Sequence, residues 1–110
     1  MRYFVKTTPE FDSRLKKRLK KYPSLSGEFR DLVLLLAQNP GNGISLGQSC
    51  YKKRLSIASK GKGKSGGARV IYYVHVSKTT IYLLTIFDKS ERESLSPIEL
   101  KELLSTLDLS

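Results

Sequence analysis

Hydrophobic positions follow two different periods along the chain. Between residues 11 and 38 they recur every three or four positions, which is the spacing of one helix face. Between residues 50 and 87 they form dense runs of Val, Ile, Tyr and Leu, which are typical of strands in a covered sheet. Helical spacing returns after residue 96. The pattern predicts an N-terminal helical part, a sheet and a last helix.

The pattern of the N-terminal residues predicts one short strand followed by two helices. Residues 2–7 are rich in aromatic and β-branched types, as in a strand. Thr8-Pro9 then starts a helix, because proline suits the first helical position, and Pro23 ends it. A second helix is expected over residues 24–38 or 26–38. We expect the two helices to pack as an antiparallel hairpin.

Three strands and one helix complete the prediction. The strands are expected at residues 51–59, 69–76 and 80–87. Ser96 and Glu99 have the spacing of a capping box, which predicts the start of the last helix. The order β-α-α-β-β-β-α indicates an α+β fold, in which a small, mostly antiparallel sheet packs against the helical hairpin and the C-terminal helix. With 110 residues, the chain is expected to form a single domain, residues 1–110.

Charge is unevenly distributed along the chain. Twenty Lys and Arg stand against ten Asp and Glu, a net charge of +10, which predicts affinity for a polyanion. Residues 32–87 contain no carboxylate, so a glycosidase-type acid pair and a two-metal nuclease site are not expected. His75 and Cys50 are the single residues of their types. We therefore expect no metal site, and we interpret His75 as a partly buried strand residue and Cys50 as a small buried hydrophobe.

Membrane insertion is not expected. The longest apolar run, Leu32 to Ala37, is six residues, much shorter than a membrane span. The N-terminus lacks the apolar core of a signal peptide. These features predict a cytoplasmic protein.

A glycine-rich basic segment separates two of the predicted strands. Residues 61–66 match G-x-G-x-x-G, but a P-loop needs a glycine where Ala58 stands, and Arg69 begins a strand rather than a helix. A bound nucleotide cofactor is therefore not expected. The segment and its flanks instead concentrate cations: Lys52, Lys53, Arg54, Lys60, Lys62, Lys64 and Arg69.

Strand geometry predicts that some of these cations converge. Residues two apart share one face of a strand, so Lys52 and Arg54 point the same way, and Arg69 can lie across the hairpin from them. Glycine permits close approach of the backbone to a phosphate, and arginine presents a planar fork to it. The alternative interpretation is a solvated basic loop that keeps the protein soluble.

The segments YKKRLSIASKGKGKSGGARVIYY (residues 51–73) and IYLLTIFDKSE (residues 81–91) resemble the RelE/ParE superfamily of bacterial toxins, in particular its RelE/HigB-like branch. The resemblance covers residues 50 to about 104. It implies a RelE-like fold and a toxin of a type II toxin-antitoxin system that acts as a ribosome-dependent mRNA endoribonuclease. The implied partners are a cognate antitoxin and mRNA on the ribosome, with contacts to 16S rRNA. No small-molecule cofactor and no membrane are implied.

The resemblance also implies site residues. The catalytic candidates are Lys52, Arg54, Lys62, Lys64, Arg69 and Lys89. The RNA-binding candidates are Tyr51, Lys53, Lys60 and Phe87. In this chemistry the ribose 2′-OH attacks the adjacent phosphate, a lysine with a lowered pKa acts as base or acid, and the arginines stabilise the charge that develops.

Two residues depart from the family pattern. Phe87 stands where relatives commonly carry a Tyr, so it can stack on a base but cannot transfer a proton. Ser56 stands where some relatives have a further Arg. Two alternatives therefore stay open: a ParE-like inhibitor of DNA gyrase without catalysis, and a module that binds RNA or the ribosome without cutting. The shared fold does not distinguish them.

Overall fold

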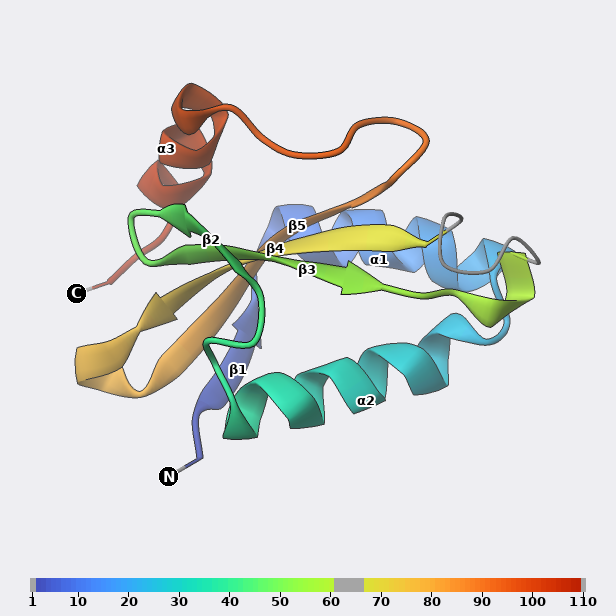
Figure 1. Ribbon diagram of the computed structural model, residues 1–110, viewed down its shortest axis with the longest axis horizontal. Coiled ribbons are helices and arrows are strands. Elements are labelled where there is room, and N and C mark those ends of the chain that lie inside the picture. Colours follow the sequence, from blue (N-terminus) through green and yellow to red (C-terminus); the bar gives the residue numbers. More distant parts are fainter. Residues whose placement is uncertain (1, 61–66, 110) are drawn as a thin grey trace.

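The computed structural model describes residues 2–60 and 67–109, which form one five-stranded sheet and three helices (Figure 1). The elements in chain order are β1 (Phe4–Thr7), α1 (Pro9–Lys21), α2 (Leu25–Gln38), β2 (Ile44–Gly47), β3 (Cys50–Leu55), η1 (Ala58–Lys60), β4 (Ala68–His75), η3 (Val76–Lys78), β5 (Thr80–Asp88) and α3 (Pro97–Ser105). The α+β class is confirmed.

The strand order in the sheet is β1-β5-β4-β3-β2. β1 runs parallel to β5, and the other neighbouring pairs are antiparallel, which confirms the mostly antiparallel sheet. Because β1 joins the sheet beside β5, the first and last strands of the chain are neighbours.

The edge strand β2 is absent from the sequence-based prediction, so the described order contains one more strand. Its four residues Ile44–Gly47 carry little hydrophobic pattern, and only Leu46 among them is partly buried. Its turn to β3 uses Gly47, Gln48 and Ser49, all with positive φ. A short edge strand of this kind gives almost no periodic signal.

β3 is shorter than predicted, because the chain leaves the sheet after Leu55. The backbone N–H of Ala58 donates to Glu28 at 2.8 Å, and Ser59 exchanges hydrogen bonds with Ser24. These contacts attach η1 to the start of α2, and this attachment replaces the expected end of the strand.

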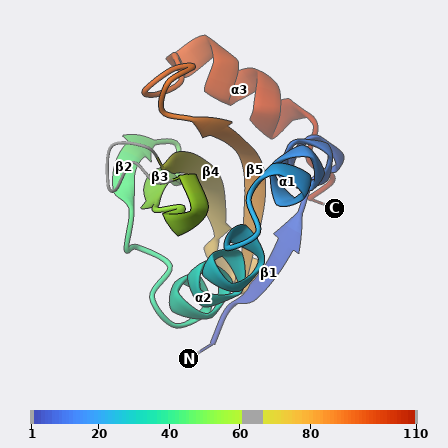
Figure 2. The ribbon, with the colours of Figure 1, turned by 90° about the vertical axis from the view of Figure 1, so that its right-hand side faces the viewer.

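Helices cover both faces of the sheet (Figure 2). α1 and α2 bury one face, where Phe11, Leu36 and Tyr72 belong to the larger hydrophobic core. α3 covers part of the other face through Leu100, which packs with Ile71 in a smaller core. No helix in the described part of the chain is long and apolar enough to cross a bilayer.

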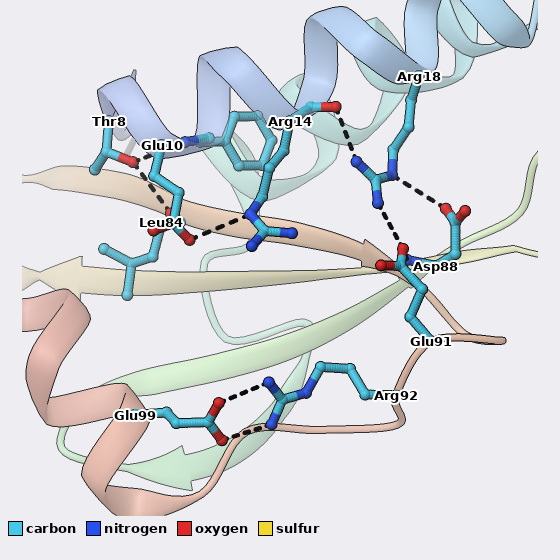
Figure 3. A network of polar contacts seen from close by, with 10 residues as sticks. Thr8, Glu10, Arg14, Arg18, Leu84, Asp88, Glu91, Arg92 and Glu99 are labelled. Atoms are coloured by element: carbon cyan, nitrogen blue, oxygen red, sulfur yellow. Dashed lines mark hydrogen bonds and ion pairs between the residues drawn. The ribbon is translucent and has the colours of Figure 1, made fainter.

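A β-bulge in β5 determines which of its side chains point into each of the two cores. The pairing between β4 and β5 shifts at Ile71 and Tyr72, which face Thr85 and Leu83, so Leu84 is an extra residue in β5. The side-chain hydroxyl of Thr8 donates to the Leu84 carbonyl at 3.1 Å (Figure 3). The same oxygen accepts from the backbone N–H of Phe11 as the N-cap of α1. Thr8 therefore joins the start of α1 to the bulge.

We expect Thr8→Val to destabilise the fold. Thr8 is buried, and valine retains its branched shape but leaves the Leu84 carbonyl and the Phe11 N–H without their partner. A lost cap and an unsatisfied buried carbonyl predict a decrease of about 2 kcal/mol in the free energy of unfolding. Urea unfolding measures the change.

Thr7→Val is the matched control, because Thr7 is exposed on the edge strand β1, and its change should stay within about 0.5 kcal/mol. Equal unfolding midpoints for the two variants would contradict the role assigned to the Thr8 hydroxyl.

Candidate functional site

The pairing of β3 with β4 places two arginines opposite each other. Arg54 pairs with Arg69, and Arg69 pairs in turn with Phe87 on β5. Directly paired residues project to the same face of a sheet, and Lys52 shares the face of Arg54 because it lies two residues away. This is the face that carries α3, since Phe87 packs in the core beneath Leu100. The sequence-based expectation that Arg54 and Arg69 lie on one face is met.

Glu93 lies against this group of cations, which we call the cationic cluster and define as Lys52, Arg54 and Arg69. Its Oε1 is 3.5 Å from Arg69 Nε and 3.8 Å from Lys52 Nζ. Lys52 Nζ also donates to the Glu93 backbone carbonyl at 3.3 Å. The segment between β5 and α3 thus supplies an anion to two members of the cluster.

Arg69 is almost completely buried, with 1% of its surface exposed. Its Nη1 donates to the carbonyl of Ala68 at 3.2 Å and its Nε to Glu93. Within residues 2–60 and 67–109, Nη2 has no acceptor. A buried guanidinium nitrogen without an acceptor is costly, so this side chain retains an unused capacity to bind an anion.

The cations act on the titration of Glu93. Partial desolvation favours its neutral form, but the charges of Arg69, Lys52 and Lys89 and the hydrogen bond from Arg69 outweigh that effect and lower its pKa below the ordinary value. The carboxylate is therefore ionised at neutral pH, and its negative charge faces the cluster.

Lys89 is the remaining described member of the predicted catalytic set. It is exposed immediately after β5, and its backbone N–H donates to the Gly67 carbonyl at 3.2 Å. Its charge is one of the causes that lower the pKa of Glu93. Lys62 and Lys64 lie outside the described residues.

Three predicted RNA-binding residues lie away from the cluster. Tyr51 and Lys53 project to the opposite face of β3, where Tyr51 stacks on Tyr72 with ring centroids 5.4 Å apart. Lys53 donates to the side chain of Asn42. Lys60 Nζ lies 3.8 Å from Asp88 Oδ1 and 5.3 Å from the centre of the Tyr22 ring. The structure gives these side chains packing or ion-pair roles on the side of α1 and α2.

Phe87 is not available for stacking in this conformation. Its exposed fraction is 2%, and the guanidinium of Arg92 lies over its ring at 5.7 Å. The expectation that Phe87 stacks on a base therefore disagrees with its burial. The alternating pattern of β5 places the ring on the face of the cluster, but α3 and the preceding segment turn that part of the face into a core.

Sequence reasoning did not identify Glu93 or Arg92. Arg92 forms a two-bond ion pair with Glu99 at 2.6 and 2.5 Å, which connects the segment after β5 to α3 (Figure 3). The hydrogen bonds from Arg92 are the main reason that the pKa of Glu99 falls to about 2. The available signal was the return of carboxylates after residue 87, directly next to the basic strands.

Ser56, His75 and Cys50 do not join the cluster. Ser56 is exposed just after β3. His75 lies at the far end of β4 from Arg69, and its Nδ1 is 3.1 Å from the hydroxyl of Ser77. Cys50 is fully buried, and burial raises the pKa of its thiol to about 11, as expected of a small core residue.

A cavity of about 560 Å³ lies between α1, β5 and α3, beside Phe87. Four glutamates line it together with two arginines, and both arginines are ion-paired to glutamates of the cavity (Figure 3). Its excess of negative charge makes it a poor site for a phosphate. The cationic cluster is therefore the better candidate for binding an anion.

Comparisons with known proteins match this chain to one family and one fold. The isolated E. coli RelE toxin has 18% identity and a TM-score of 0.56, covering 96% of this chain and 99% of that one. The intact E. coli RelBE toxin-antitoxin complex contains a chain with 20% identity and a TM-score of 0.57, covering 76% of this chain and 93% of that one. At such identities the likeness establishes the fold alone.

The family model is described as the RelE toxin of the RelE/RelB toxin-antitoxin system, and it matches residues 37–107. That range includes the sheet strands β2 to β5, the cationic cluster and α3. The resemblance expected from residues 51–73 and 81–91 is confirmed by this match. The chain belongs to the RelE toxin family.

Proposed function

We propose that this toxin is a ribosome-dependent endoribonuclease that cleaves mRNA at the cationic cluster. The observation that carries the proposal is the placement of Lys52, Arg54 and Arg69 on one face of two neighbouring strands. A phosphodiester is an anion with several acceptor oxygens, and arginine binds such groups through a planar fork of donors. Membership of the RelE family supports mRNA as the substrate class.

The proposed reaction is an internal transfer at one phosphodiester. The 2′-oxygen forms a bond to phosphorus as the bond to the 5′-oxygen breaks. The 2′-OH proton passes to a neutral lysine of the site, and the departing 5′-oxygen takes a proton from a protonated lysine. The products are a 2′,3′-cyclic phosphate and a 5′-hydroxyl end. Lys52, Lys62, Lys64 and Lys89 are the candidate lysines.

Arg54 and Arg69 would stabilise the charge that builds on the phosphoryl oxygens. Positioned donors contribute most where charge develops during the reaction, and removal of one such donor typically lowers the rate about 100- to 1000-fold. Phe87 is buried and carries no hydroxyl, so it takes no part in the proton transfers. The lysines supply that chemistry instead.

A cognate antitoxin is the proposed protein partner. Membership of a toxin family and the likeness to a chain in the RelBE complex support it. The net charge of +10 favours an acidic partner segment, since a segment of opposite charge would reduce self-repulsion and cover the cluster. We expect the gene beside this one to encode a short protein with such a segment.

We expect Arg54→Ala to abolish most of the cleavage, with a rate at least about 100-fold below wild type. Lys53→Ala is the matched control, because it removes one positive charge from the next position on β3 but from the opposite face. The cleavage rate of Lys53→Ala should stay within about threefold of the wild-type rate. Single-turnover cleavage of a defined mRNA on purified ribosomes measures both rates.

Equal losses in the two variants would show that overall charge, and not the face of β3, determines activity. An Arg54→Ala variant with full activity would show that the reaction occurs elsewhere. Thermal unfolding of both variants checks that they are folded.

Induction of the toxin in cells should produce new mRNA 5′ ends inside translated codons, carrying 5′-hydroxyl groups. Mapping of 5′-hydroxyl ends before and after induction tests this outcome. The ParE-like alternative predicts growth arrest without such ends and loss of supercoiling by purified DNA gyrase. A gyrase effect without new mRNA ends would overturn the proposal.

A further inference from the structure

The segment that joins β5 to α3 crosses the face of the sheet that carries the cationic cluster (Figure 1). We propose that the carboxylate of Glu93 occupies the phosphate position of this site and acts as a gate, which must leave before RNA binds. The proposal rests on the proposed function of the cluster and adds the control of access to it.

The position of the Glu93 carboxylate supports this role. Glu93 Oε1 lies between two cations, 3.5 Å from Arg69 Nε and 3.8 Å from Lys52 Nζ. A phosphoryl oxygen that accepted hydrogen bonds from the same two nitrogens would occupy the same region. Two anions at one position repel each other, so the carboxylate and the phosphate exclude one another.

The burial of Arg69 also supports the gate. Only 1% of its surface is exposed, so a phosphate has no direct access to the guanidinium in this conformation. Its Nη2 is buried and has no acceptor among the described residues, while Nε is given to Glu93. Glu93 therefore satisfies the guanidinium only in part. A phosphate, with more acceptor oxygens, is able to satisfy it further.

The exposure of Glu93 allows its side chain to leave the cations. The Glu93 side chain is 57% exposed, so it can rotate into solvent without breaking a core. The segment is anchored by residues other than Glu93: Glu91 pairs with Arg18 at 2.8 Å, and Arg92 pairs with Glu99 on α3 (Figure 3). These anchors let the Glu93 side chain leave the cations while the rest of the segment stays attached to α1 and α3.

The test measures binding without cleavage. The probe is a fluorescein-labelled, single-stranded RNA of twelve nucleotides in which every ribose carries a 2′-O-methyl group, so the attacking hydroxyl is blocked. Fluorescence anisotropy at about 50 mM salt gives Kd for the full chain. We expect Glu93→Gln to bind this RNA about 5- to 10-fold more tightly than wild type.

Glu102→Gln is the matched control. It removes the same charge from an exposed position on α3, where Glu102 lines the acidic cavity instead of facing the cluster. Its affinity should change less than twofold. The advantage of Glu93→Gln should also diminish as salt rises, because the interaction lost is electrostatic.

Each of the following binding results would overturn the gate. Equal gains in RNA affinity in Glu93→Gln and Glu102→Gln would show that total charge alone determines binding. Weaker binding by Glu93→Gln would show that Glu93 holds the site in its binding form. Absence of RNA binding by wild type and variant alike would show that the cluster is not an anion site.

The cleavage assay on ribosomes separates the two proposals. Tighter binding without any cleavage would support the gate and contradict the nuclease. Cleavage together with an unchanged RNA affinity in Glu93→Gln would support the nuclease and contradict the gate.

Discussion

The antiparallel pairing of β3 with β4 is the constraint on which the rest of the site depends. Pairing of Arg54 with Arg69 directs two cations to one face, and a shift by one residue would send Arg54 to the opposite side. The pairing is held by side chains of the other face, because Leu55 and Val70 belong to the core under α1 and α2. The core therefore maintains the geometry of the charged cluster.

The geometry of the cationic cluster depends on packing against both faces of the sheet. The bulge at Leu84 keeps Ile86 in the core beneath α1 and α2 and Phe87 in the core beneath α3. Thr8 satisfies the bulge through its hydroxyl, so the first helix contributes to the register of a strand far along the chain. Burial of Arg69 between these packed regions gives it a fixed orientation, at the expense of free access from solvent.

The sequence predicted the α+β class, the three helices and the convergence of Arg54 with Arg69, since each depends on local periodicity or on strand alternation. β2 escaped prediction because four mostly exposed residues carry no period. The placement of Lys60 and Tyr51 depends on tertiary partners, Asp88 and Tyr72, that no local pattern reveals. The role of Glu93 could not be predicted for the same reason, because its contacts with Lys52 and Arg69 join residues that lie far apart in the sequence.

The convergence of the cations on the reacting phosphate is tested most directly by probing contact between Arg54 and the phosphate that is cut. A single phosphorothioate at the scissile linkage of a ribosome-bound mRNA replaces one non-bridging oxygen with sulfur, a weaker hydrogen-bond acceptor. For one of the two diastereomers, we expect slower cleavage by wild type and no additional slowing in Arg54→Ala, because that contact is already lost. An undiminished thio effect in Arg54→Ala for both diastereomers would contradict the convergence of these cations on the reacting phosphate.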